Sequence, residues 1–202
     1  MTTFYIVRHG ETVWNKLRLL QGKSDSPLTE TGMEQARESA QAFQKIEFAE
    51  VFSSDLLRAK RTAEIISLEH DLVVKTTQLI RERDFGKYEG QHVDIFKNRL
   101  QEMLASLAEE EKKSFSLDGE VESEADVITR LLTFLRQTAF AYPSQNILIV
   151  THSGIIRMLL FHLGWLNRQE QEEVKIKNLA TIQLECDGTE FFLRSTSNIQ
   201  KE

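Results

Sequence analysis

Cysteine, proline and glycine are all scarce in this chain of 202 residues, which contains one, two and nine of them. A single cysteine, Cys186, cannot form an internal disulfide, and such sparing use is typical of a reducing compartment. Long disordered linkers are rich in proline and glycine, so their scarcity argues against such linkers. These absences favour one folded domain over residues 1–202, with Cys186 as a small buried apolar residue.

Positive charge is also in short supply, because 25 Lys and Arg face 31 Asp and Glu and leave a formal net charge of −6. That balance gives no sign of a nucleic-acid binder, and an acidic protein that binds anions must gather its cations in a pocket. No apolar run approaches the roughly 20 residues that span a bilayer. The first residues, MTTFYIVRHGE, lack the pattern of a signal peptide. We expect a cytoplasmic protein with no membrane or nucleic-acid partner.

Short apolar runs alternate with segments of helical periodicity through most of the chain. The expected strands are 4–7, 50–53, 73–76, 146–151, 180–186 and 190–196. The expected helices are 30–46, 55–69, 91–112, 123–141 and 154–164. This order predicts an α/β fold, a three-layer αβα sandwich with a mainly parallel central sheet and an antiparallel edge. Within the single domain, we expect segment 86–122 to form a helical flap inserted over the active site.

Local signals predict how some of these elements begin and turn. Thr31 and Glu34 have the spacing of a capping box at the start of helix 30–46. Ser54 or Asp55 can cap helix 55–69. Asp187-Gly188, between the last two strands, is a strong hairpin-turn signal.

Two predicted strands end in histidine, since Ile6-Val7-Arg8 leads to His9 and Ile149-Val150-Thr151 leads to His152. In open α/β sheets, ligands bind beyond the carboxyl ends of the strands. A lone histidine there is more often structural than functional. Two histidines at matching strand ends, each followed by small residues, reverse that preference and indicate a site.

Several blocks around these residues resemble the histidine phosphatase superfamily, also called the phosphoglycerate mutase-like family. The blocks occur in the order of the family: Arg8-His9-Gly10-Glu11-Thr12, Trp14-Asn15, Gln21-Gly22, Asp25 to Ala36, Ser53 to Ala59, Leu79 to Gly90, and Thr151 to Arg157. An isolated Arg-His-Gly motif is weak evidence for this family, but a series of blocks in the family's order, spanning roughly residues 4–185, is specific evidence. The blocks are most similar to small phosphatases of the fructose-bisphosphatase and α-ribazole phosphatase types.

The resemblance implies a role for each matching residue. His9 is implied to be the nucleophile that becomes phosphohistidine, and a neutral imidazole suits that role. Arg8, Arg58 and His152 are implied to surround the phosphoryl oxygens, because charge develops on them during transfer. Glu82 is implied to be the proton donor. The remaining implied substrate-binding residues are Thr12, Asn15, Gln21, Gly22 and Ser153.

Other residues receive structural interpretations or stay as alternatives. Glu89 competes with Glu82 for the role of proton donor. His70 and His92 are expected at the surface, and His162 in the core or at its boundary. No cluster has metal-ligand spacing such as CxxC or HExxH, so we expect neither a metal nor another cofactor.

The family contains phosphatases, mutases and inactive relatives, and membership cannot choose among them. A phosphatase acting on a small phosphorylated metabolite is favoured here. Phe85 stands where cofactor-dependent phosphoglycerate mutases have a tyrosine, and 91–122 holds no Arg-Arg pair like theirs. The alternatives are a 2,3-bisphosphoglycerate-dependent phosphoglycerate mutase and an inactive phosphate-binding relative. The substrate stays open, and exposed strand edges leave a homodimer open.

Overall fold

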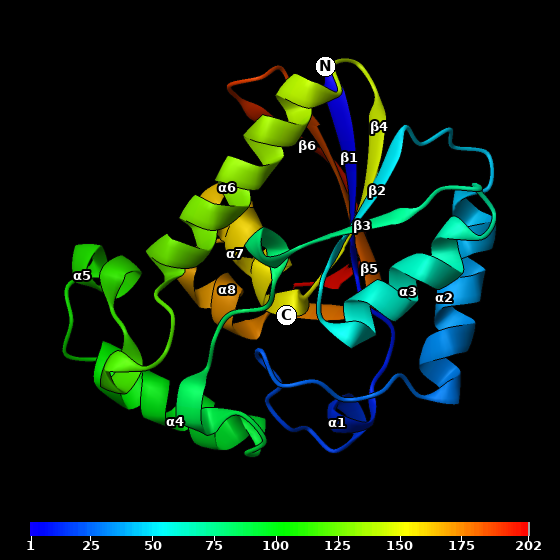
Figure 1. Cartoon of the computed structure of the whole chain (residues 1–202). Coiled ribbons are helices and arrows are strands. Elements are labelled where there is room, and N and C mark those ends of the chain that lie inside the picture. Colours follow the sequence, from blue (N-terminus) through cyan, green and yellow to red (C-terminus); the bar gives the residue numbers. More distant parts are fainter. Residues whose placement is uncertain (202) are drawn as a thin grey trace.

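The computed structural model describes residues 1–201, and six strands in these residues form one mixed sheet (Figure 1). The strands are β1 (Thr2–Arg8), β2 (Glu50–Ser54), β3 (Val74–Thr77), β4 (Asn146–Thr151), β5 (Lys175–Cys186) and β6 (Phe191–Gln200). Their order is β3-β2-β4-β1-β5-β6, with β1 to β4 mutually parallel and β5 and β6 antiparallel to their neighbours. The predicted mainly parallel sheet with an antiparallel edge is confirmed.

Helices cover both faces of this sheet (Figure 1). The helices are α1 (Val13–Lys16), α2 (Glu30–Phe43), α3 (Leu57–Ser67), α4 (Val93–Leu104), α5 (Glu109–Ser114), α6 (Glu124–Ala141), α7 (Ser153–His162) and α8 (Arg168–Glu173). On one face, α2 and α3 pack against Leu148 and Val150 of β4. On the other, α6 and α7 pack against Ile147 and Ile149. Alternate residues of one strand therefore serve two cores, as the two-residue period of a strand requires.

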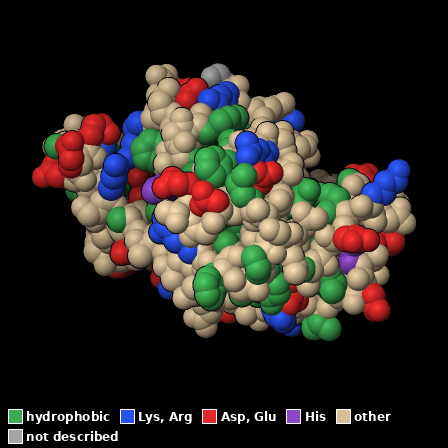
Figure 2. All heavy atoms as spheres, turned by 90° about the horizontal axis from the view of Figure 1, so that it is seen from above, with side chains coloured by type: hydrophobic (Ala, Val, Ile, Leu, Met, Phe, Trp, Pro, Cys, Tyr) green, Lys and Arg blue, Asp and Glu red, His purple; other side chains and the backbone are tan. Residues whose placement is uncertain are grey.

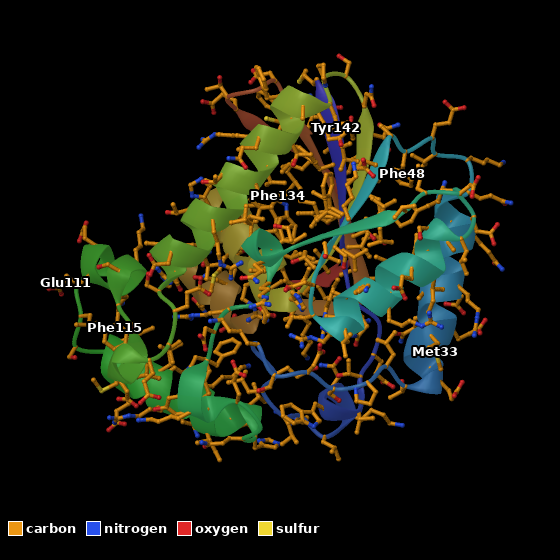
Figure 3. All side chains as sticks on the ribbon, in the orientation of Figure 1. Met33, Phe48, Glu111, Phe115, Phe134 and Tyr142 are labelled. Atoms are coloured by element: carbon orange, nitrogen blue, oxygen red, sulfur yellow. The ribbon has the colours of Figure 1, made fainter. Side chains whose placement is uncertain are left out.

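Aromatic side chains mark these two cores in Figure 3. Phe134 and Tyr142, on the α6 side, pack edge-to-face on Phe52 of β2 with ring centroids 5.3 and 6.1 Å away. Phe48, on the side of α2 and α3, packs on Tyr5 of β1 at 5.4 Å. Edge-to-face contacts at these distances are favourable, so they help to fix both layers on the sheet.

The central strands bring the two histidine-bearing ends together. β1 and β4 pair in parallel, with Arg8 opposite Thr151. The next residues, His9 and His152, therefore leave adjacent strands at the same edge of the sheet. Because helices cover both faces, β4 is an unbroken apolar run, Ile147 to Val150, with no exposed residue.

The helical segment after β3 differs from the expected single helix over 91–112. It forms α4 and α5, separated by residues 105–108. A third hydrophobic cluster, which includes Phe85, Phe96 and Leu117, joins α4 to the loops on either side of it, and Phe115, labelled in Figure 3, packs against it. Figure 1 shows α4 and α5 beyond the carboxyl ends of the parallel strands. We call residues 86–122 the cap.

Two helix starts also differ from the local signals. Thr29, rather than Thr31, caps α2, and its hydroxyl accepts a hydrogen bond from the Gly32 amide at 3.0 Å. The start of α3 receives its acceptor from another loop, because the Asp25 carboxylate accepts from the amides of Leu57 and Arg58. Helix α8 was not predicted at all.

The surface at the amino ends of the parallel strands shows no large area of one charge (Figure 2). Acidic and basic side chains are interspersed there, and hydrophobic side chains occur in small groups. Across residues 1–201, none of the helices combines the length and the apolar character needed to cross a membrane.

Candidate active site

A cavity of about 1000 Å³ opens at the carboxyl ends of β1 and β4. Eight of the ten residues that the sequence singled out line it: Arg8, His9, Asn15, Gln21, Gly22, Arg58, Glu82 and Ser153. They come from the end of β1, from α1 and the loop after it, from the start of α3, from the loop after β3 and from the start of α7. The fold thus gathers residues that lie up to 145 positions apart.

His9 is 3% exposed, and its ring is fixed by a neighbouring carbonyl. Its Nδ1 lies 2.7 Å from the Gly10 carbonyl oxygen, which can only accept, so Nδ1 carries the hydrogen. Burial, and then the charges of Arg58 and Arg8, hold the pKa of His9 well below its usual range. His9 is therefore a neutral imidazole whose Nε2 lone pair is free for attack.

His152 lies beside His9, with ring centroids 5.3 Å apart, although it is not itself part of the cavity lining. It is completely buried, and neither ring nitrogen has a hydrogen-bond partner in the described residues. Burial, and then the charge of Arg58, hold its pKa well below its usual range. A buried imidazole without a partner is costly, and a bound ligand would relieve that cost.

Two buried arginines are held from behind by carbonyl and carboxylate oxygens. Arg58, 1% exposed, donates to the Gly22 carbonyl at 2.6 Å and to Asp25 Oδ1 at 3.0 Å. Arg8 donates to the Ile176 carbonyl at 2.5 Å, and burial lowers its pKa to about 10. The Nε groups of both arginines are buried without a partner among the described residues. Two guanidinium groups with spare donors form a site that suits an oxyanion.

Glu82 is 7% exposed and its carboxylate is fixed by two backbone amides. Oε1 accepts from the Arg83 amide at 2.9 Å, and Oε2 accepts from the Gly154 amide at 3.0 Å. A Cβ atom at position 154 would lie only 2.3 Å from Glu82 Oε1. Glycine at that position therefore allows the carboxylate to approach the start of α7.

Glu89, the competing carboxylate, is used to hold a loop. Its oxygens accept from the amides of Lys23 at 2.9 Å, Ser24 at 2.8 Å and Phe85 at 3.2 Å. A Cβ at Gly22, whose φ is +53°, would meet Glu89 Oε1 at 2.0 Å. Glu89 does not line the cavity, and its hydrogen bonds fix the loop that presents Gly22.

Thr12 also lies outside the cavity lining, and its hydroxyl is used as a helix cap. It accepts from the Asn15 amide at 3.2 Å, while Asn15 Oδ1 accepts from the Thr12 amide at 3.1 Å. Asn178, which the sequence did not single out, donates to the His9 carbonyl at 3.0 Å and to Asn15 Oδ1 at 3.3 Å. Thr12 therefore acts on the site through Asn15, and Asn178 ties β5 to both site residues.

Arg130 of α6 is the second residue that sequence reasoning missed. Its Nη1 donates to the carbonyls of Leu79 and Arg81 at 2.9 and 2.7 Å, and its Nη2 reaches the Glu82 carbonyl at 3.3 Å. Glu122 completes the arrangement, with its Oε1 2.7 Å from Arg130 Nε. One guanidinium thus clamps the backbone of the loop that carries Glu82. No periodic pattern marks it, since its partners are carbonyls about fifty residues away.

The remaining histidines, His70, His92 and His162, do not line the cavity. The prediction that His162 lies in the core or at its boundary is wrong, because it is exposed at the end of α7. His92 caps the start of α4. Within residues 1–201, no three or more His, Cys, Asp or Glu side chains are grouped so that they could hold a metal ion.

Comparisons with known proteins find relatives over most of the chain. The chain is 35% identical over 164 residues to "Uncharacterized phosphatase PhoE" of Bacillus subtilis, covering 81% of this chain and 78% of that protein. It is 32% identical over 181 residues to "Probable phosphoglycerate mutase GpmB" of Cronobacter sakazakii, covering 88% and 82%. The solved structure of Bacillus stearothermophilus YhfR superposes with a TM-score of 0.81 at 26% identity, covering 96% and 95%.

The sequence model of the Histidine phosphatase superfamily (branch 1) matches residues 4–199. That match spans the strand ends, the loops and the helix starts that build the cavity. The chain belongs to the histidine phosphatase superfamily.

Proposed function

We propose that this protein hydrolyses phosphomonoesters through a phosphohistidine intermediate on His9. The observation that carries the proposal is the pairing of a neutral, oriented nucleophile with unsatisfied donors. His9 Nε2 is free, while Arg8 Nε, Arg58 Nε and His152 are buried without partners. A dianionic phosphoryl group supplies the acceptors that these donors lack.

The first step transfers the phosphoryl group to the enzyme. His9 Nε2 attacks phosphorus as the bond between phosphorus and the ester oxygen breaks, and the guanidinium groups of Arg8 and Arg58 stabilise the charge on the oxygens. Glu82 gives its proton to the departing alkoxide, which leaves as the alcohol. Asn15 and Gln21 add neutral groups to the same wall of the cavity.

The second step returns the enzyme to its starting state. A water molecule attacks the phosphorus of phosphohistidine, and Glu82, now a carboxylate, accepts its proton. The P–N bond breaks, inorganic phosphate leaves, and His9 Nε2 regains its lone pair. Two displacements with one proton carrier are easier than a direct attack of water on the ester.

The cap supports hydrolysis over the mutase alternative. A mutase must hold a second charged group of its substrate while the intermediate reorients. The α4 arginine Arg99 does not line the cavity, and it pairs with Glu102 at 2.9 Å and Asp118 at 3.8 Å. Phe85, which lines the cavity, offers no hydroxyl for that purpose.

The test measures phosphate release from p-nitrophenyl phosphate, phosphoglycerates, fructose bisphosphates and nucleotides in EDTA, with His9→Ala alongside. Phosphate release that persists in EDTA and is abolished in the variant supports the proposal. A second supporting result is an acid-labile ³²P label that a ³²P-labelled substrate leaves on the wild-type protein and not on the variant. Conversion of 3-phosphoglycerate to 2-phosphoglycerate with a bisphosphoglycerate primer, without hydrolysis, would identify a mutase. Release that is equal in His9→Ala would reject the mechanism.

A further inference from the structure

The phosphoryl site, which we also call the inner site, consists of Arg8, His9, Arg58, Glu82 and His152. The cavity extends well beyond it, and the residues that line its outer half differ in chemistry. From α4 it is lined by Val93, Phe96, Leu100 and Leu104. These positions are three or four residues apart, so they form one stripe on one face of the helix. At a rise of 1.5 Å per residue, the stripe is about 16 Å long.

Apolar side chains also line the cavity from other elements. They are Met158 of α7, Val174 after α8 and Ile176 of β5, each no more than 5% exposed. Ile176 adjoins the phosphoryl site directly, because its carbonyl accepts from Arg8 at 2.5 Å. The apolar slot, as we call the space between these residues and the α4 stripe, is therefore continuous with the phosphoryl site.

The arginines of the outer cavity are already bound to protein groups. Arg168 pairs with both oxygens of Glu124 at 2.9 Å. Arg18 pairs with Asp94 at 2.9 Å, and Arg83 Nε donates to the Glu122 carbonyl at 2.6 Å. Lys97 and Lys177 also line the cavity, but both side chains are solvent-exposed. Arg168 Nε, like Arg8 Nε and Arg58 Nε, is buried without a hydrogen-bond partner among the described residues, so the outer cavity differs from the inner site mainly in its apolar stripe.

We infer that the apolar slot selects phosphomonoesters whose alcohol carries an extended hydrocarbon group, over those of polyols and hydroxy acids. This inference rests on the proposed phosphatase activity. The phosphoryl group would occupy the inner site, and the hydrocarbon would lie between the α4 stripe and Met158, Val174 and Ile176. Burying each methylene favours binding, whereas a hydroxyl or carboxylate in the slot would lose its hydration without a partner.

The experiment compares three phosphate esters of primary alcohols: n-hexyl phosphate, glycerol 3-phosphate and 3-phosphoglycerate. A shared type of leaving group leaves the rest of the molecule as the main difference. For the wild-type enzyme we expect kcat/KM for hexyl phosphate to exceed each of the others at least about tenfold, or about 1.4 kcal/mol. Leu104→Gln should lower the value for hexyl phosphate about fivefold or more and change glycerol 3-phosphate less than twofold.

The matched control is Ile95→Gln, the same kind of change on the same helix. Ile95 is 52% exposed and does not line the cavity, so neither substrate should respond. Leu100→Gln repeats the test on the next turn of the stripe.

The outcomes separate the two proposals. A preference for 3-phosphoglycerate, or equal loss on all three esters in Leu104→Gln, would overturn the apolar slot while leaving the phosphatase intact. No hydrolysis of any ester would overturn both. Hydrolysis that needs His9, prefers hexyl phosphate and loses that preference in Leu104→Gln supports both.

Discussion

The inner site and the cap are built in opposite ways. Polar contacts hold the inner site, with buried His9, Arg58 and Glu82 each fixed by hydrogen bonds to main-chain atoms. Apolar packing holds the cap, where Tyr88, Phe96 and Leu117 belong to a small separate core. Charged groups stabilise developing charge more strongly when they are fixed and shielded from water, and the strand ends provide both conditions. An apolar helix face can change its side chains without disturbing that framework.

This contrast suggests that the two regions have different roles in catalysis. The inner site would set the rate of phosphoryl transfer, and the cap would set which alcohol is accepted. Substitutions in the two regions should therefore differ in kind. Those at the inner site should lower kcat for every substrate, and those on the α4 stripe should alter the ranking of substrates.

The largest effect expected, His9→Ala aside, is that of Glu82→Gln. Glutamine keeps the shape of the side chain and cannot donate a proton from an acid group. We expect kcat/KM for alkyl phosphates, which reports the transfer to His9, to fall about 10²- to 10⁴-fold. The kcat/KM for p-nitrophenyl phosphate should fall much less, because p-nitrophenolate leaves without a proton.

Steady-state kinetics on both substrates, with phosphate release as the readout, measures that difference. Glu89→Gln is the matched control, since Glu89 holds the loop at Lys23 and Ser24. It should affect both substrates equally. A larger loss on alkyl phosphates in Glu89→Gln than in Glu82→Gln would exchange the roles of the two carboxylates.

A smaller loss is expected from Arg130→Met, because Arg130 is a positioning residue and does not line the cavity. Without its clamp on Leu79, Arg81 and Glu82, the proposed proton donor Glu82 should be less well placed. We expect kcat/KM for alkyl phosphates to fall about 10- to 100-fold, with p-nitrophenyl phosphate affected less.

The loss on alkyl phosphates relative to the loss on p-nitrophenyl phosphate separates a positioning role from a simple loss of stability. A loss of stability would lower both activities together. Arg136→Met serves as the control on the same helix, because Arg136 is exposed and contacts Phe191. Arg130→Lys should recover only part of the activity, since an ammonium group lacks the planar fork that reaches three carbonyls and Glu122. A uniform loss on both substrates would show that Arg130 has only a structural role.

Arg130 also shows which kind of contact the sequence does not predict. The paired strand ends could be predicted, because Ile147 to Val150 and Ile6-Val7 are apolar runs that stop at a histidine followed by small residues. The contacts of Arg130 could not be predicted, because its partners are mainly backbone atoms of a distant segment. Asp25 caps α3 from another loop in place of the predicted Ser54 or Asp55, and Asp55 pairs with Arg81 instead.

The cap was the least predictable region for a related reason. Leu100, Leu104 and Leu107 continue one helical stripe across the break between α4 and α5, and no glycine or proline marks that break. The break is marked instead by the start of α5, where the Glu111 side chain accepts a hydrogen bond from the Ala108 amide at 2.9 Å. Periodicity records which face is apolar, but it does not record where the chain turns.

The smallest effect concerns stability, and it tests the two buried histidines of the inner site. Burial holds the pKa values of His9 and His152 well below the unfolded value near 6.5. Below pH about 6.5 the unfolded chain therefore binds protons that the folded chain does not. The free energy of unfolding should fall as the pH drops, by at most about 1.4 kcal/mol per pH unit for each histidine, and this loss should be absent above that pH.

Urea unfolding at pH 7.5, 6.5 and 5.5 measures this slope. His152→Asn and His9→Asn should each make the slope shallower than in the wild type. Equal slopes in the wild type and in both inner-site variants would mean that these imidazoles are not held neutral. The account of His9 as a ready nucleophile would then need another source of activation.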